Sequence, residues 1–169
     1  MAKVLADTTM SLDGFIAGPN DEMDWVFDYA GDVPAPLVGE VIETTACLRP
    51  LRPAADLVST PAGEDRPVTH APPDDEPDPA YTFISGDIRE ATARALAAGR
   101  GGNLLVLGAN VVGQCLREGL LDELRIILLP VLAGDGVRLF GESGAAARLE
   151  TLDASASGQV VNLRYRVLK

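Results

Sequence analysis

The strongest candidate for a ligand-binding position is the small-residue turn Gly108-Ala109-Asn110. It follows a continuous apolar run at residues 104–107, which predicts a strand buried on both faces, and it opens a predicted helix over residues 109–119. Ligands of open α/β sheets bind beyond the carboxyl ends of strands, and a helix start offers unpaired N–H groups and partial positive charge to a phosphate. The alternative is an ordinary strand-to-helix turn, in which glycine is common.

A second candidate is Asp13, which together with Ser11 and Gly14 follows a predicted strand over residues 4–9. A carboxylate in this position could orient a substrate or relay a proton. The alternative is a plain turn, because Asp-Gly suits a chain reversal and the side chains of Ser and Asp often hydrogen-bond their own backbone.

Three further features each allow two interpretations. Trp25, the only tryptophan, could stack on a flat heterocycle or anchor the core. Gly134 and Gly136 flank an aspartate in a tight turn that either approaches a cofactor closely or is only a loop. Arg49 and Arg52 could bind a phosphate through charge-assisted hydrogen bonds or could simply be solvated.

Composition excludes several other classes of function. The single histidine, His70, removes multi-histidine metal sites, and the two cysteines form no CxxC pair, so we expect neither a metal nor a disulfide framework. The net charge of −11 disfavours binding to nucleic acid and to anionic membranes, which leaves a small molecule as the expected partner. No signal peptide or membrane-spanning run is readable, which predicts a soluble, cytoplasmic protein.

The elements that must position these residues predict one α/β domain over residues 1–169. Strands over residues 4–9, 15–17, 81–84, 104–107 and 124–129 alternate with helices over residues 32–44, 87–99 and 109–119, which indicates a parallel sheet with helices on both faces. Near the end of the chain, Val161, Leu163, Tyr165 and Val167 alternate with polar residues and predict a half-exposed antiparallel strand at a sheet edge.

One segment breaks this pattern. Residues 50–79 hold eight of the 12 prolines, and proline lacks the backbone donor that helices and central strands need. We therefore expect an irregular, proline-rich insert at about residues 46–80, with one short strand near residues 56–59.

Several of these motifs, in this order and spacing, resemble the dihydrofolate-reductase-like family, which includes the reductase domain of bacterial bifunctional riboflavin-biosynthesis deaminase/reductase proteins. The resemblance covers about residues 3–44 and 80–169. It is carried by the blocks at residues 9–17, 24–25, 107–111, 119–124, 130–140 and 163–166.

The resemblance implies a three-layer α/β/α fold with a mixed, mostly parallel sheet and an antiparallel C-terminal edge. It also implies NADPH as cofactor and a homodimer as the assembly. Carried over by position, Thr9 lies beside the nicotinamide, and Ser11, Asp13 and Trp25 border the substrate, with Asp13 as the catalytic candidate. The implied cofactor contacts are Leu107, Gly108, Ala109, Asn110 and Val111 around the phosphates, and Gly134 and Gly136 on the far side of the cleft.

One departure from the family concerns the cofactor. The family usually carries a Gly-Arg-x-Thr stretch after its first long helix, where this chain has residues 46–53 without the glycine and the threonine. Either Arg49 or Arg52 replaces the phosphate contact, or cofactor affinity is lost. Losing two or three charge-assisted hydrogen bonds of ~1.5–3 kcal/mol each would weaken binding by several orders of magnitude.

Three hypotheses follow. The first is an NADPH-dependent reductase that transfers hydride to a C=N or C=O bond of a small heterocyclic or sugar-linked substrate, as in the riboflavin-pathway 5-amino-6-(5-phosphoribosylamino)uracil reductase and dihydrofolate reductase that the chain resembles. The second is a degenerate, non-catalytic relative that binds a nucleotide or flavin. The third is a structural homodimer that associates through an apolar C-terminal strand or helix surface.

Overall fold

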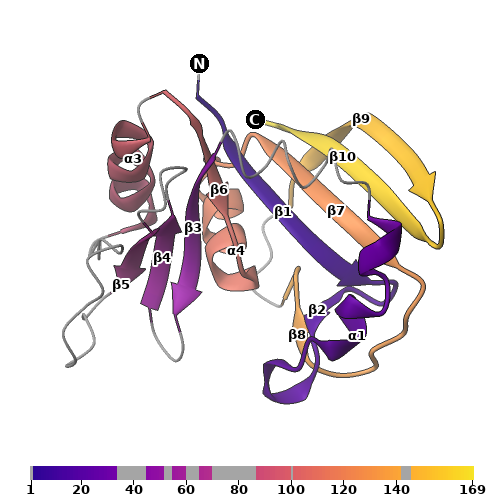
Figure 1. Cartoon of the computed structure of the whole chain (residues 1–169). Helices are drawn as coiled ribbons and strands as arrows, with labels where there is room; N and C mark the ends of the chain where they lie inside the picture. Colours follow the sequence, from indigo (N-terminus) through magenta and orange to yellow (C-terminus); the bar gives the residue numbers. More distant parts are fainter. Residues whose placement is uncertain are drawn as a thin grey trace.

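The computed structural model describes residues 2–33, 45–51, 55–59, 65–69, 87–99, 101–141 and 146–169, and within these residues one eight-stranded sheet dominates the molecule (Figure 1). Its strand order is β5-β4-β3-β6-β1-β7-β10-β9, and β2 and β8 form a separate two-stranded sheet. The strands are β1 Val4–Ser11, β2 Phe15–Ala17, β3 Thr45–Leu51, β4 Ala55–Ser59, β5 Asp65–Thr69, β6 Asn103–Val106, β7 Glu123–Leu129, β8 Val137–Arg138, β9 Arg148–Ser157 and β10 Val160–Leu168. The α-helices are α1 Asp24–Phe27, α3 Ile88–Ala98 and α4 Ala109–Arg117, and Pro19–Asp21 and Ala30–Asp32 are 3-10 helices.

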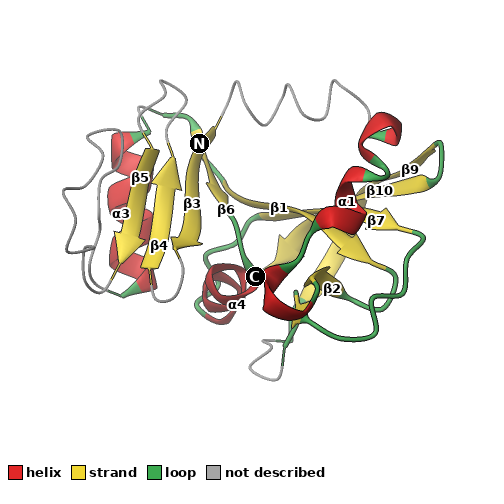
Figure 2. Cartoon of the chain, turned by 60° about the horizontal axis from the view of Figure 1, so that its bottom comes forward, coloured by secondary structure: helices red, strands yellow, loops and turns green. Residues whose placement is uncertain are grey.

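The four central strands β3, β6, β1 and β7 run parallel, and antiparallel strands flank them on both sides. This arrangement confirms the predicted fold class, an α/β fold with a mixed sheet and an antiparallel C-terminal edge. Figure 2 shows how the sheet divides along its width, with α3 beside β3 to β5 and the C-terminal pair β9 and β10 at the opposite end.

The core lies where α3 and α4 pack against one face of the sheet. Val4 and Ala6 of β1 and Val106 of β6 are buried there with Val111 and Cys115 of α4. The continuous apolar runs in β6 and β7 follow from this position, since a central parallel strand has no solvated face.

The start of α3 and the end of α4 lie at residues that commonly mark helix ends. The Asp87 carboxylate accepts a hydrogen bond from Glu90 N at 2.8 Å and caps α3. The chain after α4 turns at Gly119, whose φ of +64° favours glycine. Local sequence therefore predicts where α3 begins and where α4 ends.

The proline-rich segment differs from the prediction. The expected short strand is present as β4, but β3 and β5 are also strands where we expected an irregular chain. The two prolines within these strands occupy places that a sheet tolerates. Pro50 lies beyond the part of β3 that pairs with β6, and Pro67 lies on β5, the outermost strand on that side. Cross-strand pairing therefore overrides the local composition.

The C-terminal edge also differs in detail. Strand β10 is antiparallel as predicted, but β9 is the outermost strand, and no pattern in the sequence indicated it. The predicted alternation holds at Val167, which is buried, and reverses at the other end, where Asn162 is 6% exposed and Val161 is 37% exposed. The two ends of β10 thus bury opposite faces, and a simple period of two cannot describe them.

Two predicted elements fall outside the described residues: the helix predicted over residues 32–44, beyond its first two residues, and the strand predicted over residues 81–84. Asp32, the first residue of that predicted helix, accepts a hydrogen bond from Gln159 N at 3.1 Å through its carboxylate. The segment that ends at Asp32 is thereby fastened to the turn between β9 and β10.

Candidate functional site

Three of the predicted motifs meet at the carboxyl edge of the parallel strands. Strands β6, β1 and β7 are neighbours, so the segments that follow them leave the sheet at the same edge. Val106 at the end of β6 pairs with Ala6, so the turn at Gly108 leaves the sheet beside the part of β1 that contains Thr9. Ser11 pairs with Leu129, which brings the Asp13 turn and the loop after β7 together.

The turn at Gly108 has the geometry of an anion site. Gly108 adopts φ 83° and ψ 143°, a conformation that side chains disfavour, and no side chain caps the first turn of α4. The N–H groups of the first helical turn therefore remain available, and the helix dipole adds partial positive charge there. Asn110 is exposed, with its Oδ1 accepting from Gln114 Nε2, whereas the side chain of Val111 is fully buried and only its backbone can serve a ligand.

Asp13 fastens two loops to each other. One carboxylate oxygen accepts from Ser11 Oγ at 2.6 Å and from Ala133 N at 3.0 Å, and the other accepts from Gly134 N at 2.8 Å. The hydrogen bond from Ser11, helped by the two backbone N–H groups, outweighs the opposing effect of desolvation and lowers the pKa of Asp13 from 3.8 to about 2. Asp13 is therefore ionised at neutral pH and carries no proton to donate.

Ser11 holds the Asp13 turn in place through two hydrogen bonds. Its side chain is fully buried, and its hydroxyl donates to Asp13 and accepts from Phe15 N at 2.9 Å. The contacts of Ser11 and Asp13 in the structure are thus with the protein's own loops. Their predicted roles beside a substrate remain predictions.

Gly134 and Gly136 lie in the same loop but differ in their surroundings. Gly134 has a φ of +76°, and a Cβ placed there would have no atom within 4 Å, so this position opens to solvent. Gly136 has a φ of +129°, and a Cβ there would lie 2.1 Å from Ala17 O. Gly136 is therefore required for close packing against β2, while Gly134 presents backbone toward the open side.

Trp25 lies in the short helix α1 and leaves a polar group unpaired. Its Nε1 is buried and has no hydrogen-bond partner among the described residues, although the side chain as a whole is partly exposed. A desolvated donor without an acceptor costs about 1–3 kcal/mol, which an acceptor on a bound ligand would offset. Trp25 thus has a buried donor without a described acceptor, and its predicted role beside a substrate stays a prediction.

Asn162 is a polar residue that the sequence analysis did not select. Neither its Oδ1 nor its Nδ2 has a hydrogen-bond partner in the described structure. Asn162 pairs with Ile127, which pairs with Thr9, so the three residues form one row on the same face of the sheet. Sequence periodicity placed Asn162 on the exposed face, so no local signal identified it.

Other predicted positions contribute less to this edge. Arg49 lies on β3, next to β6, and only its backbone is described.

Among the described residues, no group of three or more His, Cys, Asp or Glu side chains could hold a metal ion. Within the same residues, no helix is long and apolar enough to cross a membrane.

A comparison with protein families gives a match to the RibD C-terminal domain over residues 69–163, more than half of the chain. The chain belongs to the RibD C-terminal domain family. The match includes the Gly108 turn, the loop after β7 and Asn162, and it confirms the resemblance inferred from the motifs. YwjB of Bacillus subtilis (strain 168), an uncharacterized protein, is 29% identical over 176 residues, which cover 96% of this chain and 97% of that protein.

Solved structures share the fold of this RibD C-terminal domain. A protein of Shewanella sp. PV-4 whose name relates it to riboflavin biosynthesis superposes over the full length of both chains, with a TM-score of 0.72 and 20% identity. The deaminase/5-amino-6-(5-phosphoribosylamino)uracil reductase of Thermotoga maritima matches 99% of this chain and 57% of its own, with a TM-score of 0.68 and 15% identity. Dihydrofolate reductase of Enterococcus faecalis, complexed with NADP(H), matches 99% of this chain and 97% of its own, with a TM-score of 0.58 and 14% identity.

Proposed function

We propose that this chain is an NADPH-dependent reductase that acts on a small heterocyclic or sugar-linked substrate. The observation that carries the proposal is the uncapped start of α4 at Gly108, which leaves the sheet beside Thr9. Membership of the RibD C-terminal domain family, and the NADP(H) complex of a dihydrofolate reductase with the same fold, support a nicotinamide cofactor.

The residues at the carboxyl edge fit such a cofactor in distinct ways. The backbone around Gly108 and Asn110 would hold the phosphates, because no side chain caps the N–H groups in the first turn of α4. Thr9, which is partly exposed near the end of β1, would lie beside the nicotinamide, and the loop at Gly134 would close the far side. Bound NADPH would supply a hydride from its nicotinamide ring.

Two side chains whose buried polar atoms have no hydrogen-bond partner among the described residues would face the substrate. The Trp25 indole N–H would donate to a substrate acceptor, and the Asn162 amide would pair with a neighbouring donor and acceptor. Such groups suit a pyrimidine or a ribosylamino compound with a C=N or C=O bond. The carbon of that bond would accept the hydride, and because Asp13 remains ionised, the proton on the nitrogen or oxygen would come from water.

NADPH is expected to raise the melting temperature and to quench the fluorescence of Trp25, which is the only tryptophan and therefore the only source of indole fluorescence. NADH serves as the comparison cofactor. The variant Gly108→Ala is expected to weaken NADPH binding about tenfold or more, because the φ of 83° is strained with a Cβ present.

Gly113→Ala is the matched control for this test. Gly113 lies in the same helix, and a Cβ there would have no atom within 4 Å, so alanine keeps or slightly improves stability and leaves NADPH affinity unchanged. Absence of both a melting shift and quenching in the wild-type protein would refute cofactor binding at this site. Binding without NADPH oxidation across a panel of heterocyclic substrates would favour the non-catalytic alternative instead.

We also propose that the protein is a homodimer that associates through β9. Nine of the ten residues of this outermost strand are exposed, and an unprotected edge strand of this length is a template for pairing with another chain. Its exposed apolar side chains include Leu149 and Leu152, at 42% and 36% exposure.

Light scattering is expected to give twice the chain mass of 17.7 kDa. The double variant Leu149→Glu with Leu152→Glu is expected to shift the protein to a monomer, because it places charge on the two exposed leucines of the strand. Leu132→Glu is the control, since Leu132 is 73% exposed in the loop after β7 and is not part of β9. A wild-type monomer, or equal effects of the two changes, would contradict this assembly.

A further inference from the structure

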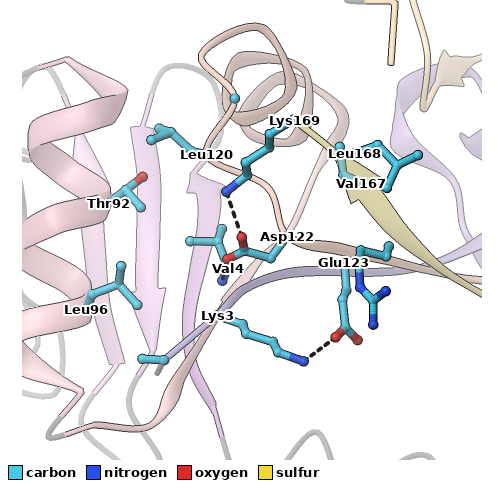
Figure 3. A pocket seen from close by; sticks show the side chains of 13 residues that line it. Lys3, Val4, Thr92, Leu96, Leu120, Asp122, Glu123, Val167, Leu168 and Lys169 are labelled. Atoms are coloured by element: carbon cyan, nitrogen blue, oxygen red, sulfur yellow. Dashed lines mark hydrogen bonds and ion pairs between the residues drawn. The ribbon is translucent and has the colours of Figure 1, made fainter. Parts of the chain in front are cut away.

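A cavity of about 830 Å³ opens at the edge of the sheet opposite the Gly108 turn (Figure 3). It lies at the amino ends of β1 and β7, and β1 is eight residues long, so about 25 Å separates this cavity from the carboxyl edge. Its lining comes from α3, the chain before β1, the loop between α4 and β7, and the end of β10. Six of the lining residues bear on what the cavity could bind: Lys3, Thr92, Leu120, Asp122, Glu123 and Lys169.

The interior of the cavity is mainly apolar, with one buried hydroxyl. Its apolar lining includes leucine and valine side chains from α3, β1, the α4–β7 loop and β10. Thr92 lies among them, and Figure 3 shows its side chain directed from α3 toward the space beside Leu120. Thr92 is 2% exposed, and its Oγ1 has no hydrogen-bond partner in the described part of the chain. Such a hydroxyl is more stable when a ligand atom pairs with it.

The rim of the cavity has one more cationic than anionic side chain, although the chain as a whole is acidic, and each cation forms an ion pair. Three cationic side chains and two carboxylates line it, whereas the chain as a whole carries a net charge of −11. Lys3 Nζ contacts Glu123 Oε1 at 2.5 Å, and Lys169 Nζ contacts Asp122 Oδ1 at 2.7 Å. Both lysine side chains are still 49% exposed, and an ammonium group has three donors.

The two carboxylates are satisfied by the protein itself. The second oxygen of Asp122 accepts from Val4 N at 2.8 Å, and the second oxygen of Glu123 accepts from Arg164 Nε at 2.8 Å. The Glu123 side chain is also only 3% exposed. Acceptors at the rim are therefore occupied while donors of Lys3 and Lys169 face solvent, which favours an anionic group over a cationic one.

We propose that this cavity is a second ligand site, which binds a small amphipathic organic acid. The carboxylate of the ligand pairs with Lys3 and Lys169, and its aryl or alkyl body lies against Leu120 and the other apolar side chains. A hydroxyl on that body pairs with Thr92 Oγ1. This site is independent of the NADPH proposal, because none of its lining residues belongs to the carboxyl edge.

The test uses 4-(4-hydroxyphenyl)butanoate as the probe, with isothermal titration calorimetry on the full chain at low salt. The probe is expected to bind at least tenfold more tightly than the neutral alcohol 4-(4-hydroxyphenyl)butan-1-ol, and saturating NADPH is expected not to displace it. Lys169→Gln, a change at a half-exposed side chain that does not threaten the fold, is expected to weaken binding severalfold and to reduce its salt dependence.

Two further variants test the apolar part of the site. Leu120→Trp is expected to fill the cavity and abolish binding, whereas Leu132→Trp, in the exposed loop, leaves binding unchanged. Thr92→Val keeps the shape of the side chain and is expected to remove the preference for the probe over 4-phenylbutanoate. Equal affinity for the acid and the neutral alcohol, or binding that neither Lys169→Gln nor Leu120→Trp alters, would overturn the proposal.

Discussion

Replacing Gly136 by alanine is expected to destabilise the protein by about 4 kcal/mol, the sum of a steric and a conformational cost. A Cβ at this position would lie 2.1 Å from Ala17 O and 2.7 Å from Gly18 Cα, and both atoms belong to backbone. The φ of +129° is also a conformation that alanine avoids. Neither strand of the β2–β8 pair can retreat easily, because Ala17 is paired with Val137 in the small sheet.

Gly134→Ala is the matched control for this prediction. Gly134 also has a positive φ, +76°, but a Cβ there would have no atom within 4 Å, so only the conformational cost of about 1 kcal/mol remains. The measurement is the free energy of unfolding in urea for both variants. Equal losses in the two proteins would show that close backbone contact with β2 does not constrain Gly136.

The elements that the sequence predicted correctly are those with local signals. The Asp87 cap precedes α3 by one residue, Gly119 follows α4, and the apolar runs at residues 104–106 and 126–129 form most of β6 and the second half of β7. In each case the signal lies within the element or within two residues of its end. Packing of α3 and α4 on one face of the sheet then follows from their buried stripes.

The elements that the sequence did not predict depend on distant partners. Strands β3 and β5 contain prolines that local rules exclude from a central strand, and they form because β4 pairs with both of them. Strand β9 has no pattern to detect, since nearly every residue on both of its faces is exposed. Long-range pairing of this kind leaves no periodicity in the sequence.

The candidate site shows the same division. Residue types and order located the Gly108 turn, and the structure places it beside β1 as a parallel sheet requires. The sequence did not predict Asn162 as a site residue, because its burial depends on which end of β10 is covered, and no local pattern indicates which end that is. The contacts of Asp13 could not be predicted either, because its partners Ala133 and Gly134 lie about 120 residues further along the sequence.

Those contacts give the prediction with the largest expected effect on catalysis. Asp13→Asn is expected to lower kcat/KM about 100-fold for NADPH oxidation with the best substrate of the heterocycle panel. The amide keeps the size of the side chain but replaces one acceptor oxygen by a donor, which then opposes Ser11 Oγ–H or a backbone N–H of the 133–134 turn. The loop after β7 shifts as a result, and the reacting groups lose their alignment.

Ser11→Ala is the matched variant, because it removes one of the three hydrogen bonds to Asp13, together with the acceptor of Phe15 N, and leaves the carboxylate in place. Its loss of kcat/KM is expected to be about tenfold, smaller than that of Asp13→Asn. If Asp13 acted only as a general acid, Ser11→Ala would change the pH profile of kcat/KM more than its magnitude. With the pKa of Asp13 near 2, the wild-type profile is instead expected to show no break from this group between about pH 5 and 8.

Stability gives an independent measurement of the same contacts. The pKa of Asp13 is lower in the folded protein than its usual 3.8, so its ionised form stabilises the fold at neutral pH, and that contribution is lost as pH falls from about 4 to about 2. The melting temperatures of wild type and Asp13→Asn are therefore expected to differ at pH 7 and to converge across this acidic range. A difference that stays constant down to pH 2 would mean that the carboxylate does not hold the two loops through its charge.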